Sequence, residues 1–265
     1  MASKSSARKN VVQQARSARP PRAADRSWEF VKSLLPLVLI FLGIRAFVIE
    51  AYRIPSPSMV PTMLVGDWLF VNKFLYGLTI PFTSTQIRLA VPGTRLRLYR
   101  DPRRYDILVF RSPPQSDQPQ DPTPTLVKRV IGLPGDTIYM RRGAVFINGE
   151  SVRRDFEHTP GEEGDYYNPL FEWQHGYEVK GSRFGAPPAR PSVDDWGPLV
   201  VPAEHYIMLG DNRHSSKDSR YWGLVPRRNI RGKPLFVYYS FDPECGSGVC
   251  FLTDIRWRRI GHLIR

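Results

Sequence analysis

Two serine hydroxyls lie two positions apart in a proline-rich turn, Ser56 and Ser58 within the segment Ile-Pro-Ser-Pro-Ser-Met-Val-Pro-Thr at 54–62. A hydroxyl in such a turn could act as a nucleophile, but free serine reacts poorly at neutral pH and needs a nearby base. The segment follows the only strongly apolar stretch of the chain by a few residues. We therefore expect a nucleophile that meets its substrate at a membrane surface. The alternative is that both serines are ordinary turn residues.

Two later segments also combine residue types that could do chemistry. Lys128 lies within the apolar run 126–131, and residues 210–223, called the polar box below, are dense in Asp, Asn, Arg and Ser. Taken alone, Lys128 would be a solvated lysine on a strand. The polar box would be a hydrogen-bonded loop or an anion site.

Metal and cofactor chemistry is not expected. None of the five histidines has the spacing of a zinc-protease motif. Cys245 and Cys250 have no further cysteine or histidine nearby, which argues against a zinc site. In an oxidising compartment these two cysteines could close a short disulfide loop, and otherwise they are two free thiols.

The net charge of +13 is unevenly distributed along the chain. Residues 1–33 contain eight lysines and arginines but only Asp25 and Glu29 as acids, so almost half of the excess positive charge lies in this arm. The remaining basic residues are scattered and mixed with acids. The total charge alone would raise the idea of a nucleic-acid partner, but this distribution argues against one.

The apolar stretch 34–49 predicts a membrane-spanning helix. Its sixteen residues reach only about 24 Å as a helix, but counting back to Trp28 gives about 33 Å, enough for a bilayer core of roughly 30 Å. Arg45 lies near one end, where its side chain can reach the headgroups. The basic arm before the stretch places the N-terminus in the cytoplasm. The alternatives are a cleavable signal peptide and a buried hairpin of a soluble protein.

We thus expect a basic cytoplasmic arm at 1–27, a transmembrane signal anchor at 28–50 and an extracytoplasmic domain at 51–265. The outer part contains short β-prone runs separated by turn signals and no long helical period, which predicts an all-β domain. The candidate strands are 68–71, 107–110, 126–131, 137–140, 144–147, 206–209 and 235–239.

Turn signals divide this domain further. Arg142-Gly143 and Asn148-Gly149 predict tight turns on either side of the run 144–147. The proline-crowded segment 112–125 is expected to be an extended or mobile loop. Residues 153–200 have weak periodicity and are expected to form a second irregular insertion.

Three segments, in this order after the anchor, resemble the type I signal peptidases, membrane-bound serine endopeptidases that remove signal peptides from exported proteins. The segment 54–62 with Gly66-Asp67 resembles the nucleophile segment of that family. Leu-Val-Lys-Arg-Val-Ile-Gly-Leu-Pro-Gly-Asp at 126–136 resembles its general-base segment. The polar box, Gly-Asp-Asn-Arg-His-Ser-Ser-Lys-Asp-Ser-Arg-Tyr-Trp-Gly, resembles its third conserved box. The resemblance implies the antiparallel β fold of signal peptidases, preceded by one transmembrane helix.

By this resemblance Ser58 is the nucleophile and Lys128 is the general base. A lysine can accept a proton only when it is neutral, and burial among the flanking apolar residues would lower its pKa toward about 7–8. A shift of about 2–3 units corresponds to about 3–4 kcal/mol, which burial can supply. Seventy positions separate the two residues. The contact between them is therefore implied by the family alone.

The resemblance assigns further roles. The Ser56 hydroxyl and the Ser58 backbone amide form an oxyanion hole, which stabilises the charge of the tetrahedral transition state. Ser216 orients the lysine, and Asp218 and Arg220 brace the polar box. The substrate binds extended along a strand edge. The residues that match the pockets for small substrate side chains at −1 and −3 are Ile54, Pro55, Met59, Met63, Leu126 and Val127.

Three positions depart from the family pattern. His214 stands where an acid is usual, Tyr105 where a glycine is common, and Pro57 where a small residue usually separates the two serines. A Ser-His mechanism through His214 is not favoured, because the sequence shows no evident acid to orient the imidazole.

Together these features predict a serine endopeptidase of the inner (cytoplasmic) membrane, single-pass, with a periplasmic or extracytoplasmic catalytic domain. It would cut after a small-x-small motif with a Ser-Lys dyad and no cofactor. Its partners would be the signal peptides of exported preproteins and the lipid bilayer, close to the protein export machinery. One alternative is a non-catalytic anchored module that binds signal segments. Another is a self-cleaving Ser-Lys repressor-type protease, although its candidate cleavage pair, Cys245-Gly246, follows the polar box.

Overall fold

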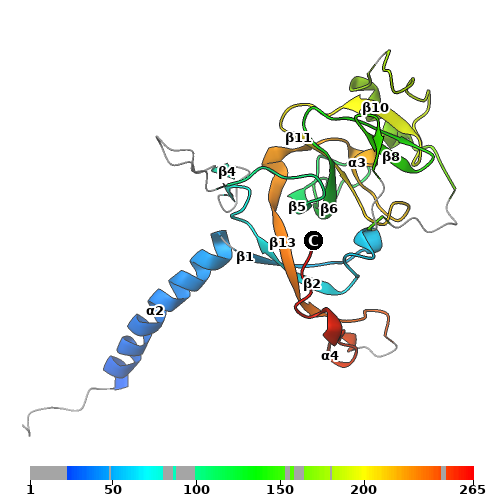
Figure 1. The fold of residues 1–265 in the computed structure, drawn as a ribbon. Helices are drawn as coiled ribbons and strands as arrows, with labels where there is room; N and C mark the ends of the chain where they lie inside the picture. The colour runs from blue at the N-terminus through cyan, green and yellow to red at the C-terminus, as the bar shows by residue number, and fades with distance from the viewer. Residues whose placement is uncertain are drawn as a thin grey trace, which may run out of the picture. The chain divides into compact units, whose positions relative to one another are not determined.

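The computed structural model describes residues 23–47, 49–79, 86–87, 99–152, 156–157, 164–179, 181–245 and 249–265. The chain divides into two compact units, Met1–Arg45 and Ala46–Arg265 (Figure 1). The larger unit contains all the strands and every predicted site residue. Most of the predicted basic arm 1–27 lies outside the described residues.

The predicted anchor region contains one long helix, α2, at Ala23–Phe47. Pro36 lies inside this helix, and the large apolar side chains from Leu34 to Leu42 are exposed. Over the part of the chain that the structure describes, no helix has both the length and the apolar character needed to cross a membrane. The last two residues of the predicted anchor, Ile49 and Glu50, belong to strand β1, Ile49–Arg53, which pairs with β2.

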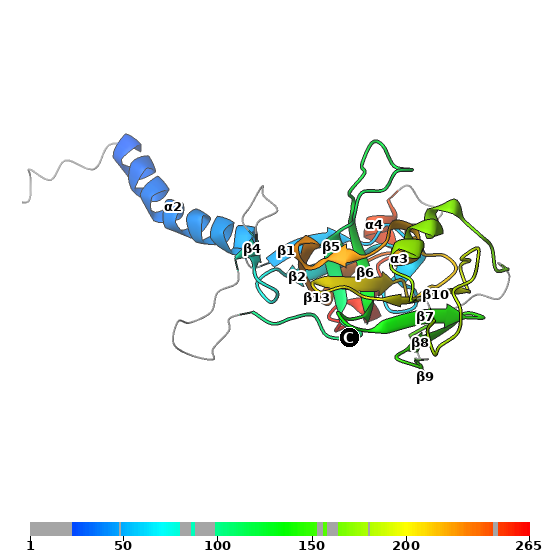
Figure 2. The ribbon, with the colours of Figure 1, turned by 90° about the horizontal axis from the view of Figure 1, so that it is seen from above.

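An antiparallel seven-stranded sheet is the main element of the larger unit (Figures 1 and 2). Its strands lie in the order β1-β2-β13-β5-β6-β11-β12. Their bounds are β1 Ile49–Arg53, β2 Asp67–Asn72, β13 Ile230–Ser240, β5 Ile107–Arg111, β6 Thr125–Gly132, β11 His205–Leu209 and β12 Val225–Pro226.

A second antiparallel sheet has the order β10-β7-β8-β9. Its strands are β10 Trp196–Val200, β7 Thr137–Arg141, β8 Ala144–Ile147 and β9 Glu150–Ser151, and a separate pair is formed by β3 Leu78–Thr79 and β4 Gln86–Ile87. The short helices are η1 Pro57–Met59, η2 Pro169–Gly176, α3 Ser219–Trp222, η3 Arg227–Asn229, α4 Cys250–Thr253 and η4 Trp257–Arg259.

The prediction of an antiparallel β domain is confirmed, and each of the seven candidate strands lies within an observed strand. The turn at Arg142-Gly143 has positive φ at both residues (49° and 76°) and joins β7 to β8. This is the backbone of a type I′ hairpin turn, whose twist matches that of the flanking strands. Asn148-Gly149 has the same signature (54° and 96°) between β8 and β9.

Three apolar clusters form the core. The first joins the two sheets, since it contains Ile131 and Ile207 from the main sheet and Ile138 and Trp196 from the second. The second cluster includes Leu108, Phe110, Val130, Met208 and Trp222. The third lies under η1 and consists of Ile54, Met59, Met63, Leu69, Ile107, Val237 and Ile264. The third cluster therefore couples the serine turn to the sheet and to the last residues of the chain.

The two predicted insertions differ in their structure. Residues 112–125 contain no helix or strand before β6 begins at Thr125, but the loop is hydrogen-bonded internally, with Gln115 N donating to Pro122 O at 2.7 Å. Within 153–200 the described residues include η2 and β10, so this region is less irregular than predicted. The strand β10 escaped prediction because Gly197-Pro198 interrupts its apolar pattern.

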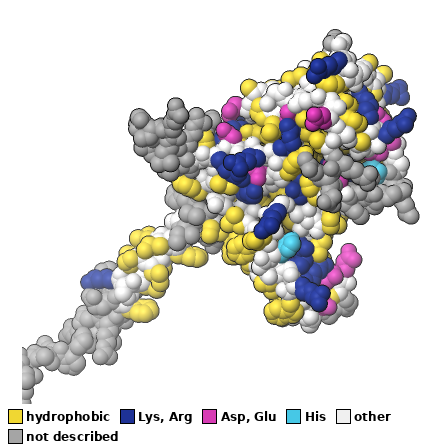
Figure 3. All heavy atoms as spheres, in the orientation of Figure 1, with side chains coloured by type: hydrophobic (Ala, Val, Ile, Leu, Met, Phe, Trp, Pro, Cys, Tyr) yellow, Lys and Arg dark blue, Asp and Glu magenta, His cyan; other side chains and the backbone are white. Residues whose placement is uncertain are grey.

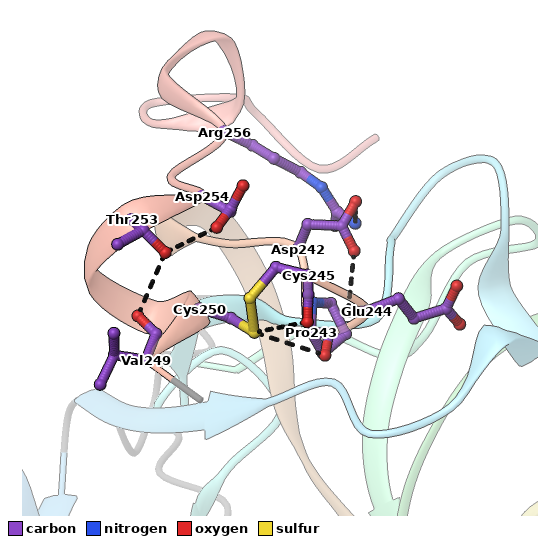
Figure 4. The surroundings of a disulfide bond; sticks show 9 residues. All are labelled: Asp242, Pro243, Glu244, Cys245, Val249, Cys250, Thr253, Asp254 and Arg256. Carbon is purple, nitrogen blue, oxygen red and sulfur yellow. Dashed lines mark hydrogen bonds and ion pairs between the residues drawn. A yellow bond between two sulfur atoms is a disulfide. The ribbon is translucent and has the colours of Figure 1, made fainter. Parts of the chain in front are cut away.

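Cys245 and Cys250 form a disulfide at the start of the C-terminal segment (Figure 4). The disulfide option for these cysteines is therefore confirmed. Cys250 begins α4, and Arg256 beyond that helix forms an ion pair with Asp242 at 3.1 Å. Arg259 then donates to the buried Asp67 at 2.6 Å, which ties the segment to β2.

Charged side chains on the larger unit are interspersed. Figure 3 shows Lys and Arg side chains in separate groups on one face, with Asp and Glu among them. The ion pairs of the described residues include Arg227 with Asp101 and Lys217 with Asp117. The visible surface thus shows the mixed charge distribution that the sequence predicted for this region.

Candidate active site

Ser58 lies in the 3₁₀ turn η1, which packing holds in place. Pro57 occupies the first position of the turn, where its fixed φ is favourable and its missing N–H is not needed. Val60 N donates to Pro57 O at 3.0 Å and closes the turn. Met59 is fully buried in the third cluster, so the apolar side chain fixes the direction in which the neighbouring Ser58 points. Ser58 itself is only 7% exposed.

Lys128 lies on β6, in the middle of the main sheet. It is the register partner of Leu108 on β5, and its neighbour Arg129 is the partner of Leu209 on β11. Alternation along a strand sends Lys128 and Arg129 to opposite faces, and both faces are covered. Lys128 is 3% exposed. Its Nζ donates to Ser58 Oγ at 2.5 Å, so the structure brings together the predicted nucleophile and the predicted base.

The surroundings of Lys128 favour its neutral form. Its pKa is lowered to about 8, mainly by burial and also by the positive charge of Arg220. The carboxylates of Asp218 and Asp211 act in the opposite direction and limit the shift. A protonated amine has no lone pair to accept a proton, whereas the neutral amine does. Near pH 8 a substantial fraction of the protein therefore has a lysine that can accept the Ser58 proton.

The second serine of the turn lies beside the first. Ser56 is exposed, and its Oγ is 3.3 Å from Ser58 Oγ. A hydroxyl at this position can donate a hydrogen bond to an oxygen that sits next to Ser58. The arrangement suits the oxyanion role that the resemblance assigned to Ser56.

The polar box packs directly onto the serine turn. Asn212 holds two consecutive carbonyls, since its backbone N–H donates to Ser58 O at 3.2 Å and its Nδ2 donates to Pro57 O at 3.3 Å. Gly210 is required by this close approach. A Cβ at that position would lie 2.1 Å from Ser216 Oγ and 2.5 Å from Ser58 O.

The buried pair of Asp218 and Arg220 organises the polar box from within. Arg220 Nη2 is 2.8 Å from Asp218 Oδ2, and it also donates to Arg213 O at 2.5 Å. Asp218 in turn accepts from Gly210 N at 3.0 Å and from Arg220 N at 3.2 Å, which caps α3. These contacts fit the bracing role predicted for both residues.

Ser216 is placed differently from the other predicted residues. Its side chain is buried, but its Oγ has no hydrogen-bond partner among the described residues. The structure therefore shows no direct bond from Ser216 to Lys128. The lysine-orienting role of Ser216 stays a prediction.

The six residues predicted to line the substrate pockets lie in different surroundings. Ile54, Met59 and Met63 are buried in the third cluster, and Val127 packs against it. Leu126 instead packs against the second cluster. Pro55 is exposed.

Part of one edge of β6 has no partner strand among the described residues. The partner strand β11 pairs with β6 only from Arg129 to Gly132. Along Thr125 to Lys128, β6 pairs with β5 on one side, and no described strand pairs with the other side. An extended peptide can add to such an edge by main-chain hydrogen bonds.

A buried ion pair next to Lys128 was not predicted from the sequence. Arg129 donates to Asp211 through Nε at 2.7 Å and through Nη2 at 2.6 Å, and Thr62 Oγ1 donates to the same carboxylate at 2.6 Å. The pair joins β6 to the polar box and to the residues after the serine turn. The available signal was the alternation along β6, because a strand covered on both faces must bury Arg129 as well as Lys128.

Comparison with known proteins identifies the family. A family model described as signal peptidase, peptidase S26, matches residues 27–239. The chain belongs to this signal peptidase family. The resemblance seen in the three segments is therefore confirmed.

Several signal peptidases are similar to this chain over most of its length. A signal peptidase I of Pseudomonas aeruginosa is 38% identical over 235 residues, covering 83% of this chain and 75% of the relative. A signal peptidase I of Leptolyngbya laminosa is 34% identical over 228 residues, covering 85% and 86%. A crystal structure of a signal peptidase I from Enterococcus faecalis aligns with 51% of this chain and 97% of that chain, at 29% identity and a TM-score of 0.32.

Two departures from the family pattern have visible local consequences. Tyr105, where a glycine is common, has φ of 71°, a left-handed conformation that glycine adopts at lower cost. Its ring packs 5.6 Å from that of Phe156. His214, where an acid is usual, lies 3.2 Å from the carboxylate of Asp194. An acid orienting this histidine thus exists, but the pair does not involve Ser58, whose side-chain hydrogen-bond partners among the described residues are Ser56 and Lys128.

Proposed function

We propose that this chain is a serine endopeptidase that removes N-terminal signal peptides from exported preproteins, with Ser58 as nucleophile and neutral Lys128 as general base. Membership of the S26 signal peptidase family supports the class of reaction. The observation that carries the residue roles is the 2.5 Å hydrogen bond between Lys128 Nζ and Ser58 Oγ in a buried setting. The lowered pKa of Lys128, about 8, supports the role of base.

The proposed reaction proceeds through an acyl-enzyme. Ser58 Oγ attacks the scissile carbonyl carbon while Lys128 Nζ takes the hydroxyl proton. The tetrahedral oxyanion is stabilised by the Ser56 hydroxyl and the Ser58 amide. Lys128 then gives its proton to the departing amine, which leaves the acyl group on Ser58. A water molecule, deprotonated by Lys128, hydrolyses this ester and restores the serine.

Substrate recognition in this proposal uses the open edge of β6. The peptide lies extended along Thr125 to Lys128, with its scissile carbonyl at Ser58. Met59 and Met63 are fully buried, and Ile54 and Val127 pack with them. In this proposal the substrate side chains at −1 and −3 contact this closely packed cluster, which favours small residues. A small-x-small motif is therefore the expected cleavage signal.

We include membrane attachment in the proposal. The exposed apolar side chains of α2 and the preceding basic residues support an anchor with the N-terminus in the cytoplasm. The Cys245–Cys250 disulfide supports an oxidising, extracytoplasmic location for the larger unit. Anchoring would confine enzyme and signal segment to one plane and so raise their effective concentration. Alkaline extraction of membranes tests this, because an anchored full-length chain stays in the pellet, and release into the supernatant would contradict it.

A cleavage assay tests the function itself. Full-length protein in detergent is incubated with a preprotein that carries an Ala-x-Ala site, and the products are identified by mass spectrometry. We expect one cut directly after that site with the unsubstituted protein and none with Ser58→Ala or Lys128→Met. A serine-directed acylating probe should label the protein, and the label should be absent in Ser58→Ala. Turnover that survives in either variant would reject the proposed dyad.

A further inference from the structure

The sequence did not indicate a role for the region 153–200. Its described residues 164–179 and 181–200, called the lobe here, form hydrogen bonds with the polar box. Its Val193 O accepts from Arg220 Nη1 at 3.2 Å, and its Trp173 Nε1 donates to Arg220 O at 2.9 Å. Its Tyr166 hydroxyl lies 2.5 Å from that of Tyr221. These contacts reach the last third of the polar box.

One contact reaches the part of the polar box that is nearest to Ser58. Asp194 Oδ1 of the lobe lies 3.2 Å from His214 Nε2, and the two side chains are 17% and 6% exposed. The other ring nitrogen of His214, Nδ1, has no hydrogen-bond partner among the described residues. Within the described part of the chain, the hydrogen bond to Asp194 is thus the one that orients the imidazole.

Asp194 is itself held rigidly. Its backbone N–H donates to Asp165 Oδ1 at 3.0 Å, and its carbonyl accepts from Gly143 N at 3.1 Å, in the turn between β7 and β8. The preceding Val193 N donates to Tyr166 O at 3.0 Å. The carboxylate that meets His214 thus projects from a loop anchored on the second sheet, and it provides a fixed reference point.

A short stretch of chain connects His214 to the proposed nucleophile. Asn212, two positions before His214, donates to the carbonyls of both Ser58 and Pro57. Between them, Arg213 donates to Gly210 O at 3.1 Å through Nε and to Glu157 at 2.7 Å. A shift of residues 212–214 would move the carbonyl of Ser58, and with it the Oγ that faces Lys128.

We propose that Asp194 is a positioning residue for the reaction, acting through His214 to hold residues 212–214 against the Ser58 turn. The proposal rests on the proposed function. It gives the lobe a role in catalysis without contact to the substrate. It also accounts for His214, because an acid at position 214 would face the carboxylate of Asp194, and like charges at that distance repel.

The charge-exchanged pair gives the decisive test. In Asp194→Ala we expect kcat for the preprotein to fall about 10- to 100-fold, as small misplacements of reacting groups do, with KM within about twofold. His214→Asp should be impaired at least as much. The double variant Asp194→His with His214→Asp restores the attraction in reverse order and should recover kcat to within about threefold of the unsubstituted protein. Asp194→Asn keeps an oxygen that can accept a hydrogen bond from His214 Nε2–H. Its kcat should therefore also stay within about threefold of that of the unsubstituted protein.

A second histidine–carboxylate pair of the lobe provides the control. His175 Nδ1 lies 2.7 Å from Glu178 Oε1, and over the described residues no side-chain hydrogen bond or ion pair links these two to the polar box. His175→Ala should leave kcat within about twofold, as expected for an exposed substitution away from the site. Thermal unfolding of each variant separates loss of folding from loss of positioning.

The outcomes distinguish the two proposals. An unsubstituted protein that cleaves no preprotein would contradict the proposed function. With cleavage established, an unchanged kcat in Asp194→Ala would overturn the positioning role. A double variant that is no more active than His214→Asp alone would also overturn the positioning role. A folded double variant with recovered kcat would support the positioning role.

Discussion

Lys128 Nζ and Ser58 Oγ lie 2.5 Å apart although they are seventy positions apart in sequence. The contact exists because β6 runs through the middle of the main sheet while η1 packs its Met59 into the cluster beside it. The same burial that excludes water from Lys128 lowers its pKa to about 8. The same packing of η1 against the main sheet therefore produces both the contact between Lys128 and Ser58 and the lowered pKa of Lys128.

Burial of Lys128 should reduce stability. Because its pKa falls on folding from 10.5 to about 8, the unfolded chain binds more protons across that window. The free energy of unfolding should therefore rise with pH between about 8 and 10.5. Lys128→Met removes the cost of burying the charge, so we expect it to raise the free energy of unfolding at pH 7 by about 1–3 kcal/mol. Urea unfolding of the two proteins at pH 7 measures this, and a destabilised Lys128→Met would contradict it.

The ion pair of Arg129 and Asp211 should be important for stability. Both side chains are buried, so Asp211→Asn leaves the Arg129 charge without its counterion. We expect a loss of about 3–5 kcal/mol in the free energy of unfolding. Asp117→Asn is the matched control, because its pair with Lys217 is exposed and such pairs contribute at most about 1 kcal/mol. If urea unfolding gave equal losses for the two substitutions, burial would not determine how much an ion pair contributes to the free energy of unfolding.

The disulfide should stabilise the C-terminal segment without affecting catalysis. It closes a short loop, with a sequence separation of 5, for which the loop-entropy relation gives about 2 kcal/mol. Cys245→Ser with Cys250→Ser should lower the free energy of unfolding by about that amount and leave kcat/KM within about twofold. Figure 4 shows the bond among residues of the C-terminal segment, none of which is a predicted site residue. A large loss of kcat/KM in a folded double variant would show that the segment acts on the site.

Much of the β architecture could be predicted, because it depends on local pattern. Runs such as 107–110 and 126–131 are apolar, bounded by turn signals, and form the central strands β5 and β6. β10 was missed since Gly197-Pro198 resembles a turn. The first two residues of β1, Ile49 and Glu50, were assigned to the anchor because the apolar stretch continues into Ile49, whereas in the structure they pair with β2.

The site was harder to predict, because its contacts join distant parts of the chain. Family resemblance named Ser58 and Lys128, but register and packing bring them together. No local signal pairs Arg129 with Asp211 or His214 with Asp194, since each pair depends on how separate strands and loops meet. The role of Ser216 stays a prediction from its motif position, because its buried hydroxyl has no hydrogen-bond partner among the described residues.

The most direct test of the account is the pH dependence of preprotein cleavage by the full-length protein. Lys128 must lose its proton before it can take one from Ser58, so kcat/KM should rise about tenfold per pH unit below the pKa of Lys128 and level off above it. The midpoint is expected near pH 8. Lys217→Met, which removes a partly exposed lysine of the polar box, should show the same profile. A rate that is constant from about pH 6 to 10 would contradict a neutral lysine as the base.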